Sequence, residues 1–141
     1  MAAICCTLLV DDDETTNFLN QALLRRMAVT DTVLVAGNGQ QALDLLRTHC
    51  LPGASSSCPS LVLLDMKMPL MNGFEFLQAY DQRPPADNSA VVIIMLTTSL
   101  NPKDVEQMKD LPIAGYLIKP LTRDKIDQIV REHFGHPARG N

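Results

Sequence analysis

The chain has 141 residues, 46% hydrophobic and 20% charged, which is the size and composition of one folded domain and excludes a disordered segment. Its net charge of −4 argues against a general nucleic-acid-binding protein, because such surfaces are usually basic. No apolar run approaches the about 20 residues of a membrane span, and residues 1–10 suit a strand better than a signal peptide. We therefore expect a cytoplasmic protein with no nucleic-acid and no membrane partner.

Short apolar runs alternate with amphipathic stretches in the first half of the chain. Residues 4–10 predict a strand, and Asp13 or Glu14 opens a helix. The face of this helix predicted to meet the core carries Phe18, Leu19, Ala22, Leu23 and Met27. Residues 32–36 predict a second strand, rich in β-branched residues. After the turn signal at residues 38–39, a second helix carries Ala42, Leu43, Leu45 and Leu46 at helical spacing.

The same alternation continues in the second half. A loop at 52–60 leads to a strand at 61–64 that ends at Asp65, and a helix after Gly73 carries Phe74, Phe76, Leu77 and Tyr80. A Pro-containing loop at 83–89 precedes the most apolar strand, residues 90–96. Pro102 lies in the first turn of a helix with Val105 and Met108 inward. Residues 113–118 predict the fifth strand, and Thr122 caps a last helix with Ile126, Ile129, Val130 and Phe134 inward.

Strand and helix thus alternate five times. Because strands this apolar on both faces belong to parallel sheets covered by helices, the pattern predicts a single α/β domain. Right-handed crossovers then give a flavodoxin-like (βα)5 doubly wound sandwich, with its five parallel strands in the order 2-1-3-4-5. The predicted domain fills residues 1–141, with a core at about 4–134 and a short tail at 135–141.

Polar residues stand where four of the predicted strands end. Asp11 and Asp12 follow the first strand and Asp65 ends the third. Thr97 follows the fourth strand and Lys119 the fifth. Because the carboxyl ends of parallel strands form the binding edge of such a sheet, we expect these side chains to share one cleft.

This set of groups has a specific chemistry. Carboxylates at close quarters repel one another unless a cation lies among them, and Mg²⁺ suits such oxygen ligands. Asp65 can then act as a nucleophile toward a phosphoryl group. Mg²⁺ and Lys119 would neutralise the transferred oxygens, and the Thr97 hydroxyl would donate to one of them.

Each of these residues also has a purely structural interpretation. The acidic run at 11–13 suits the first turn of a helix, and Asp65 suits a turn. Thr97 could be a plain cap, and Lys119 a solvated loop lysine. The site is favoured because all of them fall at strand ends of one predicted sheet.

At this point the sequence resembles the response-regulator receiver family, over about residues 4–134. Residues 8–13 (LLVDDD) resemble its first strand and acidic pair, and residues 63–73 (LLDMKMPLMNG) the segment around its phosphoacceptor. Residues 95–97 (MLT) resemble the segment with the switch hydroxyl, and residues 116–121 (YLIKPL) the fifth strand with its lysine and proline.

The resemblance implies roles for individual residues. Asp11, Asp12 and Asp65 would bind Mg²⁺, with Mn²⁺ as a substitute, together with the backbone carbonyl of Lys67. Asp65 would be the phosphoacceptor, with Lys119 and Thr97 beside it. The peptide bond from Lys119 to Pro120 would be cis, and Tyr116 would be the aromatic side chain that rotates when Thr97 is drawn inward.

A function in two-component or phosphorelay signalling follows from this resemblance. A sensor histidine kinase or a histidine phosphotransfer protein would donate the phosphoryl group. The chain would be a switch rather than a conventional enzyme, with self-catalysed phosphorylation and autodephosphorylation. Phosphorylation would remodel the surface of the fourth helix, fifth strand and fifth helix, which would contact a downstream protein or a second copy of the chain. No DNA-binding output domain is expected.

Three other functions compete with this one. A haloacid-dehalogenase-like phosphatase needs a second Asp two residues after its nucleophile, where this chain has Lys67. A flavodoxin needs a phosphate-binding loop after the first strand, where this chain has four acids at 11–14 that would repel an anionic cofactor. A degenerate receiver usually lacks one of the acids, the Thr or the Lys, and this chain has all of them.

Overall fold

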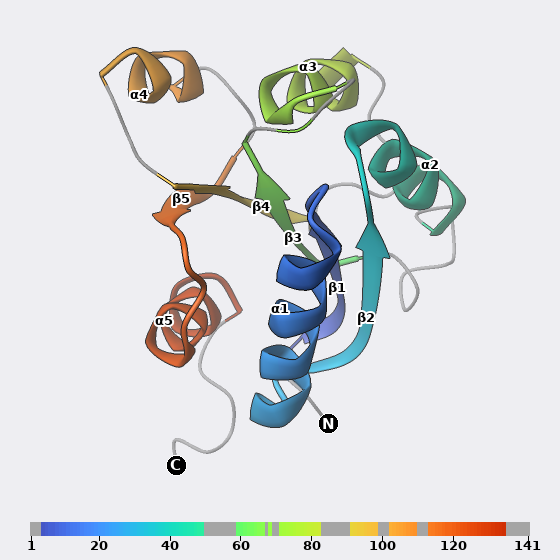
Figure 1. The fold of residues 1–141 in the computed structure, drawn as a ribbon, viewed down its shortest axis with the longest axis vertical. Helices are drawn as coiled ribbons and strands as arrows, with labels where there is room; N and C mark the ends of the chain where they lie inside the picture. The colour runs from blue at the N-terminus through green and yellow to red at the C-terminus, as the bar shows by residue number, and fades with distance from the viewer. Residues whose placement is uncertain are drawn as a thin grey trace.

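A computed structural model describes residues 4–49, 59–66, 68, 71–82, 91–98, 102–109 and 113–134. Strands and helices alternate along it (Figure 1). The strands are β1 (Ile4–Val10), β2 (Thr30–Ala36), β3 (Leu61–Asp65), β4 (Val92–Thr97) and β5 (Gly115–Ile118). The helices are α1 (Glu14–Met27), α2 (Gly39–His49), α3 (Gly73–Gln82), α4 (Pro102–Met108) and α5 (Arg123–His133). The predicted loops at 52–58 and 83–89 and the tail at 135–141 lie outside the described residues.

The sheet has the predicted topology. Its five strands run parallel in the order β2-β1-β3-β4-β5. Figure 1 shows α1 and α5 on one face of the sheet and α2, α3 and α4 on the other. This is the doubly wound sandwich expected from the sequence, and its binding edge lies at the carboxyl ends of the strands.

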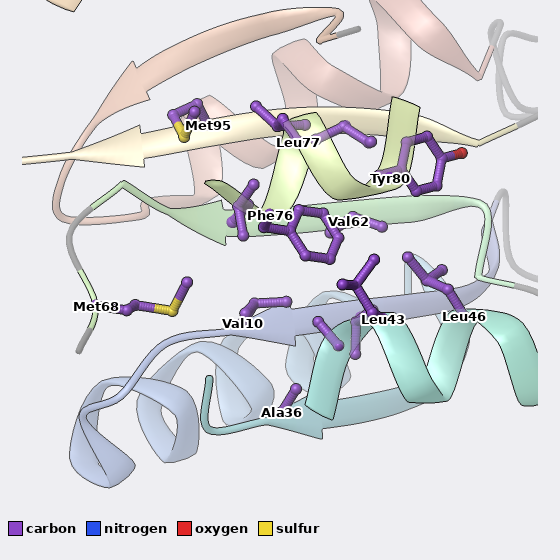
Figure 2. Close-up of a cluster of buried hydrophobic side chains, with 14 of the residues drawn as sticks. Val10, Ala36, Leu43, Leu46, Val62, Met68, Phe76, Leu77, Tyr80 and Met95 are labelled. Carbon is purple, nitrogen blue, oxygen red and sulfur yellow. The ribbon is translucent and has the colours of Figure 1, made fainter. Parts of the chain in front are cut away.

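Two cores hold the layers together. The core under α2 and α3 contains Val10, Leu43, Val62, Phe76 and Met95, all buried (Figure 2). The core under α1 and α5 is built around Leu9, Leu24, Leu63, Ile94 and Ile126. Both use the apolar β1, β3 and β4, which are covered on both faces as parallel strands require.

The predicted orientation of the first helix is wrong in part. Phe18 is 67% exposed and Leu19 is 58% exposed, whereas Asn17 and Leu24 are buried. The helix is turned so that the Asn17 side-chain amide donates a 2.8 Å hydrogen bond to the backbone carbonyl of Asp11. A polar contact at the start of the helix therefore takes the place of the apolar contact that periodicity alone predicted.

Three strand boundaries also differ from the predicted ones. β2 begins two residues early at Thr30, whose hydroxyl accepts a 3.0 Å hydrogen bond from Thr7 and donates to the carbonyl of Thr32. β4 begins later than predicted and runs through Thr97, and β5 begins only at Gly115.

Thr122 caps α5 as predicted, because its side chain accepts a hydrogen bond from the backbone N–H of Lys125. Within the described parts of the chain, no helix is both long and apolar enough to cross a membrane.

Candidate functional site

The ends of β1, β3, β4 and β5 bring the predicted polar residues to one edge of the sheet. Asp11 follows β1, Asp65 ends β3, Thr97 ends β4 and Lys119 follows β5. Asp65, Thr97 and Lys119 line one small cavity of about 150 Å³ together with Met66 and Thr98. The parallel register places Asp65 opposite Leu96 of β4, so the ends of these two strands are level.

Lys119 joins the first and third strands across the site. Its Nζ lies 2.8 Å from Oδ2 of Asp11 and 3.1 Å from Oδ1 of Asp65. Partial burial lowers the pKa of the Lys119 amine, but the hydrogen bonds and negative charges of Asp11 and Asp65 outweigh this effect and leave its pKa above the usual value. The amine is therefore positively charged at neutral pH, held between two buried carboxylates.

Three carboxylates meet beside this lysine. Asp11, Asp12 and Asp65 each place an oxygen within 4.8 Å of the others. Asp11 and Asp65 are buried, whereas Asp12 is exposed at the mouth of the cluster. Three negative charges at this spacing repel one another, and one ammonium group compensates for only part of that repulsion. Three carboxylates that offer hard oxygen ligands suit a divalent cation such as Mg²⁺.

Local hydrogen bonds fix the orientation of Asp11. The backbone N–H of Asp13 donates to its Oδ1 at 2.9 Å, and the Asn17 amide holds its carbonyl. Asp13 itself caps α1: its carboxylate accepts from the N–H of Thr15 at 3.2 Å and from the hydroxyl of Thr16 at 2.6 Å. The bond from Thr16 lowers the pKa of the Asp13 carboxyl. Of the acidic run, Asp13 therefore caps the helix while Asp11 and Asp12 turn to the site.

The loop after Asp65 depends on a glycine. A Cβ on Gly73 would lie 3.0 Å from the carbonyl oxygen of Asp65, 3.0 Å from Sδ of Met95 and 3.1 Å from Cα of Met66. The Gly73 N–H donates to the Met66 carbonyl at 2.9 Å, which closes the start of α3 onto the end of β3. A side chain at this position would force these neighbours to shift by a few tenths of an ångström.

Two further predictions concern the fifth strand and the loop after Asp65. The peptide bond from Lys119 to Pro120 is cis, as predicted. The side chain of Tyr116 is 41% exposed. The carbonyl of Lys67, predicted as a metal ligand, lies outside the described residues.

Asn17 contributes to the site although its sequence position did not reveal it. The apolar neighbours Phe18 and Leu19 dominate the helical pattern of this segment and mask Asn17. The available signal was the spacing from Asn17 to Leu24, which is two helical turns and places both on one face.

Fold and site together define an α/β protein with a doubly wound parallel sheet and an anionic, cation-compatible pocket at its carboxyl edge. Residues 7–131 match the family model of the response regulator receiver domain. The chain belongs to this family, and it is a receiver domain of two-component signalling.

Several known proteins are similar to it. A two-component response regulator from Cytophaga hutchinsonii superposes with a TM-score of 0.80 at 25% identity, over 93% of this chain and 97% of that one. The chemotaxis protein CheY4 of Vibrio cholerae superposes with a TM-score of 0.71 at 25% identity, over 94% of this chain and 98% of that one. The probable methanogenesis regulatory protein FilR2 of Methanothrix harundinacea is 31% identical over 89% of this chain and 78% of its own length.

The share of each relative that the chain spans varies widely. The transcriptional regulatory protein ZraR of Klebsiella oxytoca is 36% identical over 92% of this chain, but the match covers only 26% of ZraR. Response regulator Rcp1 of Synechocystis is 30% identical over 79% of this chain and 74% of its own length. The family is therefore found both in short proteins and within much longer ones.

Proposed function

We propose that Asp65 accepts a phosphoryl group from a phosphohistidine of a sensor histidine kinase or a histidine phosphotransfer protein. The observation that supports this most strongly is the Lys119 ammonium held at 3.1 Å from Asp65, with Asp11 and Asp12 alongside. Such a set places a nucleophilic oxygen, a fixed positive charge and a cation site at one point.

In this reaction an oxygen of the Asp65 carboxylate attacks phosphorus, and the bond from phosphorus to the imidazole nitrogen breaks. The imidazole leaves with that electron pair. The Lys119 ammonium remains in the pocket to pair with the oxygens of the transferred group, and the Thr97 hydroxyl donates to one of them. Hydrolysis of the resulting acyl phosphate returns Asp65 to its carboxylate, so the domain resets itself.

The three carboxylates fit Mg²⁺, with Mn²⁺ as a substitute. Asp11, Asp12 and Asp65 would hold the ion, and the backbone carbonyl of Lys67 would complete the protein ligands. When bound, the ion neutralises the charge that develops on the transferred phosphoryl group. The fit rests on the donor set, because three carboxylate oxygens lie within 4.8 Å of one another and the Lys119 ammonium compensates for only part of their repulsion.

The output is a change in surface rather than an enzymatic product. Thr97 moves toward the phosphoryl group and Tyr116 turns inward behind it, which alters the face formed by α4, β5 and α5. Tyr116 and Ile118 are the exposed apolar side chains of β5, at 41% and 45%. This face would contact a downstream protein or a second copy of the chain in the cytoplasm.

Intact-protein mass spectrometry after incubation with acetyl phosphate tests the chemistry. We expect a gain of one phosphoryl group that requires Mg²⁺ and is lost in Asp65→Asn. A matched control is Asp44→Asn, which makes the same charge change on an exposed residue of α2 and can keep the hydrogen bond from Gln40. Equal labelling of Asp65→Asn and the wild type would refute the assignment.

The switch is tested separately. In a Tyr80→Phe background, Tyr116 is the one remaining tyrosine, and the chain has no Trp. Its fluorescence should change on phosphorylation, and Thr97→Ala should blunt this change while leaving phosphorylation possible. An undiminished response in Thr97→Ala would exclude the coupling between these two residues.

A further inference from the structure

The segment that carries Lys119 follows a short edge strand. β5 has four residues and lies at the edge of the sheet, so it pairs with β4 alone. The backbone N–H of Lys119 donates to the carbonyl of Thr97 at 2.7 Å, which holds the segment on the β4 side. The carbonyls of Ile118 and Pro120, on either side of Lys119, are bound by a different element.

A lysine of α5 binds both of these carbonyls. Nζ of Lys125 lies 2.5 Å from the Ile118 oxygen and 3.0 Å from the Pro120 oxygen. Because hydrogen bonds from a charged donor are roughly twice as strong as neutral ones, this ammonium ties the backbone of the residue before Lys119 to that of the residue after it. The loop is thus held from both sides, by Thr97 and by Lys125.

Lys125 lies in the first turn of α5. It is the third residue of α5, where the positive end of the helix dipole disfavours a cation. The two loop carbonyls offset this cost, because they accept hydrogen bonds from the ammonium.

We propose that Lys125 is a positioning residue that holds the 118–120 segment so that the Lys119 amine reaches Asp11 and Asp65. This inference rests on the proposed function for its effect on phosphorylation, although its structural part is independent. Lys125 acts through the backbone on either side of Lys119. Its removal lets the segment move and lowers the fraction of molecules in which the Lys119 amine is in place.

The test compares Lys125→Met, which keeps an apolar stem, with Lys125→Arg, which keeps a cationic donor. The matched control is Arg123→Met, which removes an exposed cation two residues earlier in the same turn. In the metal-free protein, the NMR signal of the Lys119 ammonium reports its contact with the carboxylates. We expect this signal to broaden and shift toward that of a solvated lysine in Lys125→Met, and to be unchanged in Arg123→Met.

The rate of phosphorylation by acetyl phosphate with Mg²⁺ is the second measurement. We expect a loss of about fivefold in Lys125→Met, the equivalent of one hydrogen bond to a partly exposed charged group, and recovery in Lys125→Arg. In a Lys119→Met background, Lys125→Met should have no further effect, because the amine through which it acts is gone.

Three results would overturn the proposal. They are an unchanged Lys119 signal in Lys125→Met, an unchanged rate in that variant, and a loss of the same size in the Lys119→Met background. If the wild type takes up no phosphoryl group, the proposed function fails instead. In that case the NMR signal alone decides whether Lys125 positions Lys119.

Discussion

Replacing Asp12 by Asn should stabilise the metal-free protein. Two unit charges within 4.8 Å of each other repel by at least roughly 0.9 kcal/mol in water and by several times more in a buried site. Because Asp12 is exposed, the lower value applies to its pairs with Asp11 and Asp65. Attraction to the Lys119 ammonium offsets part of this. The net gain expected for Asp12→Asn is therefore about 1 kcal/mol in the free energy of unfolding.

Saturating Mg²⁺ should reverse the order of stabilities. An ion that binds the folded state adds stability according to its affinity, and the variant has lost one carboxylate ligand. Urea unfolding followed by circular dichroism, with and without Mg²⁺, measures both states. Mg²⁺ should raise the free energy of unfolding of the wild type clearly more than that of the variant.

Asp44→Asn serves as the control, because it removes the same charge from an exposed position on α2. It should leave the response to Mg²⁺ unchanged. A variant Asp12→Asn that is less stable than the wild type without metal, or that gains as much from Mg²⁺, would refute the electrostatic argument.

Three further predictions concern the fold around the site. Gly73→Ala should cost roughly 1–3 kcal/mol in urea unfolding, because its Cβ meets backbone atoms and Sδ of Met95; a neutral result would contradict this packing. Leu24→Ala should cost about 3 kcal/mol and Phe18→Ala less than about 0.5 kcal/mol, since only Leu24 is buried; the reverse order would contradict the orientation of α1. Burial raises the pKa of the Cys6 thiol to about 11, so the unfolded chain loses this proton at a lower pH than the folded protein does. The free energy of unfolding should therefore fall by roughly 2 kcal/mol as the pH rises from about 9 to about 11. A Cys6→Ala variant should lack this part of the pH dependence, and an identical profile would contradict it.

The topology and the set of site residues were predictable because they depend on strong, local signals. Apolar runs such as residues 61–64 mark buried strands without any knowledge of their neighbours. Once the strands were ordered, their carboxyl ends placed Asp11, Asp65 and Lys119 at one edge, and the structure brings these three into direct contact. What each of them does in phosphoryl transfer stays a prediction until it is tested.

The features that escaped prediction depend on contacts between distant elements. The orientation of α1 is set by the hydrogen bond from Asn17 to the backbone of Asp11, which no apolar periodicity encodes. The contact of Lys125 with the carbonyls of Ile118 and Pro120 depends likewise on how α5 folds back onto the loop. A lysine in the first turn of a helix has no sequence signal that separates this role from simple solvation.

The central claim is that Asp65 carries the phosphoryl group, and chemical trapping tests it most directly. Borohydride reduces an aspartyl phosphate to homoserine, which tandem mass spectrometry then locates in a peptide. After incubation with acetyl phosphate and Mg²⁺, the account predicts homoserine at position 65 and at no other aspartate. Homoserine at a different position, or a phosphoryl group that withstands borohydride on a Ser, Thr or His, would contradict it.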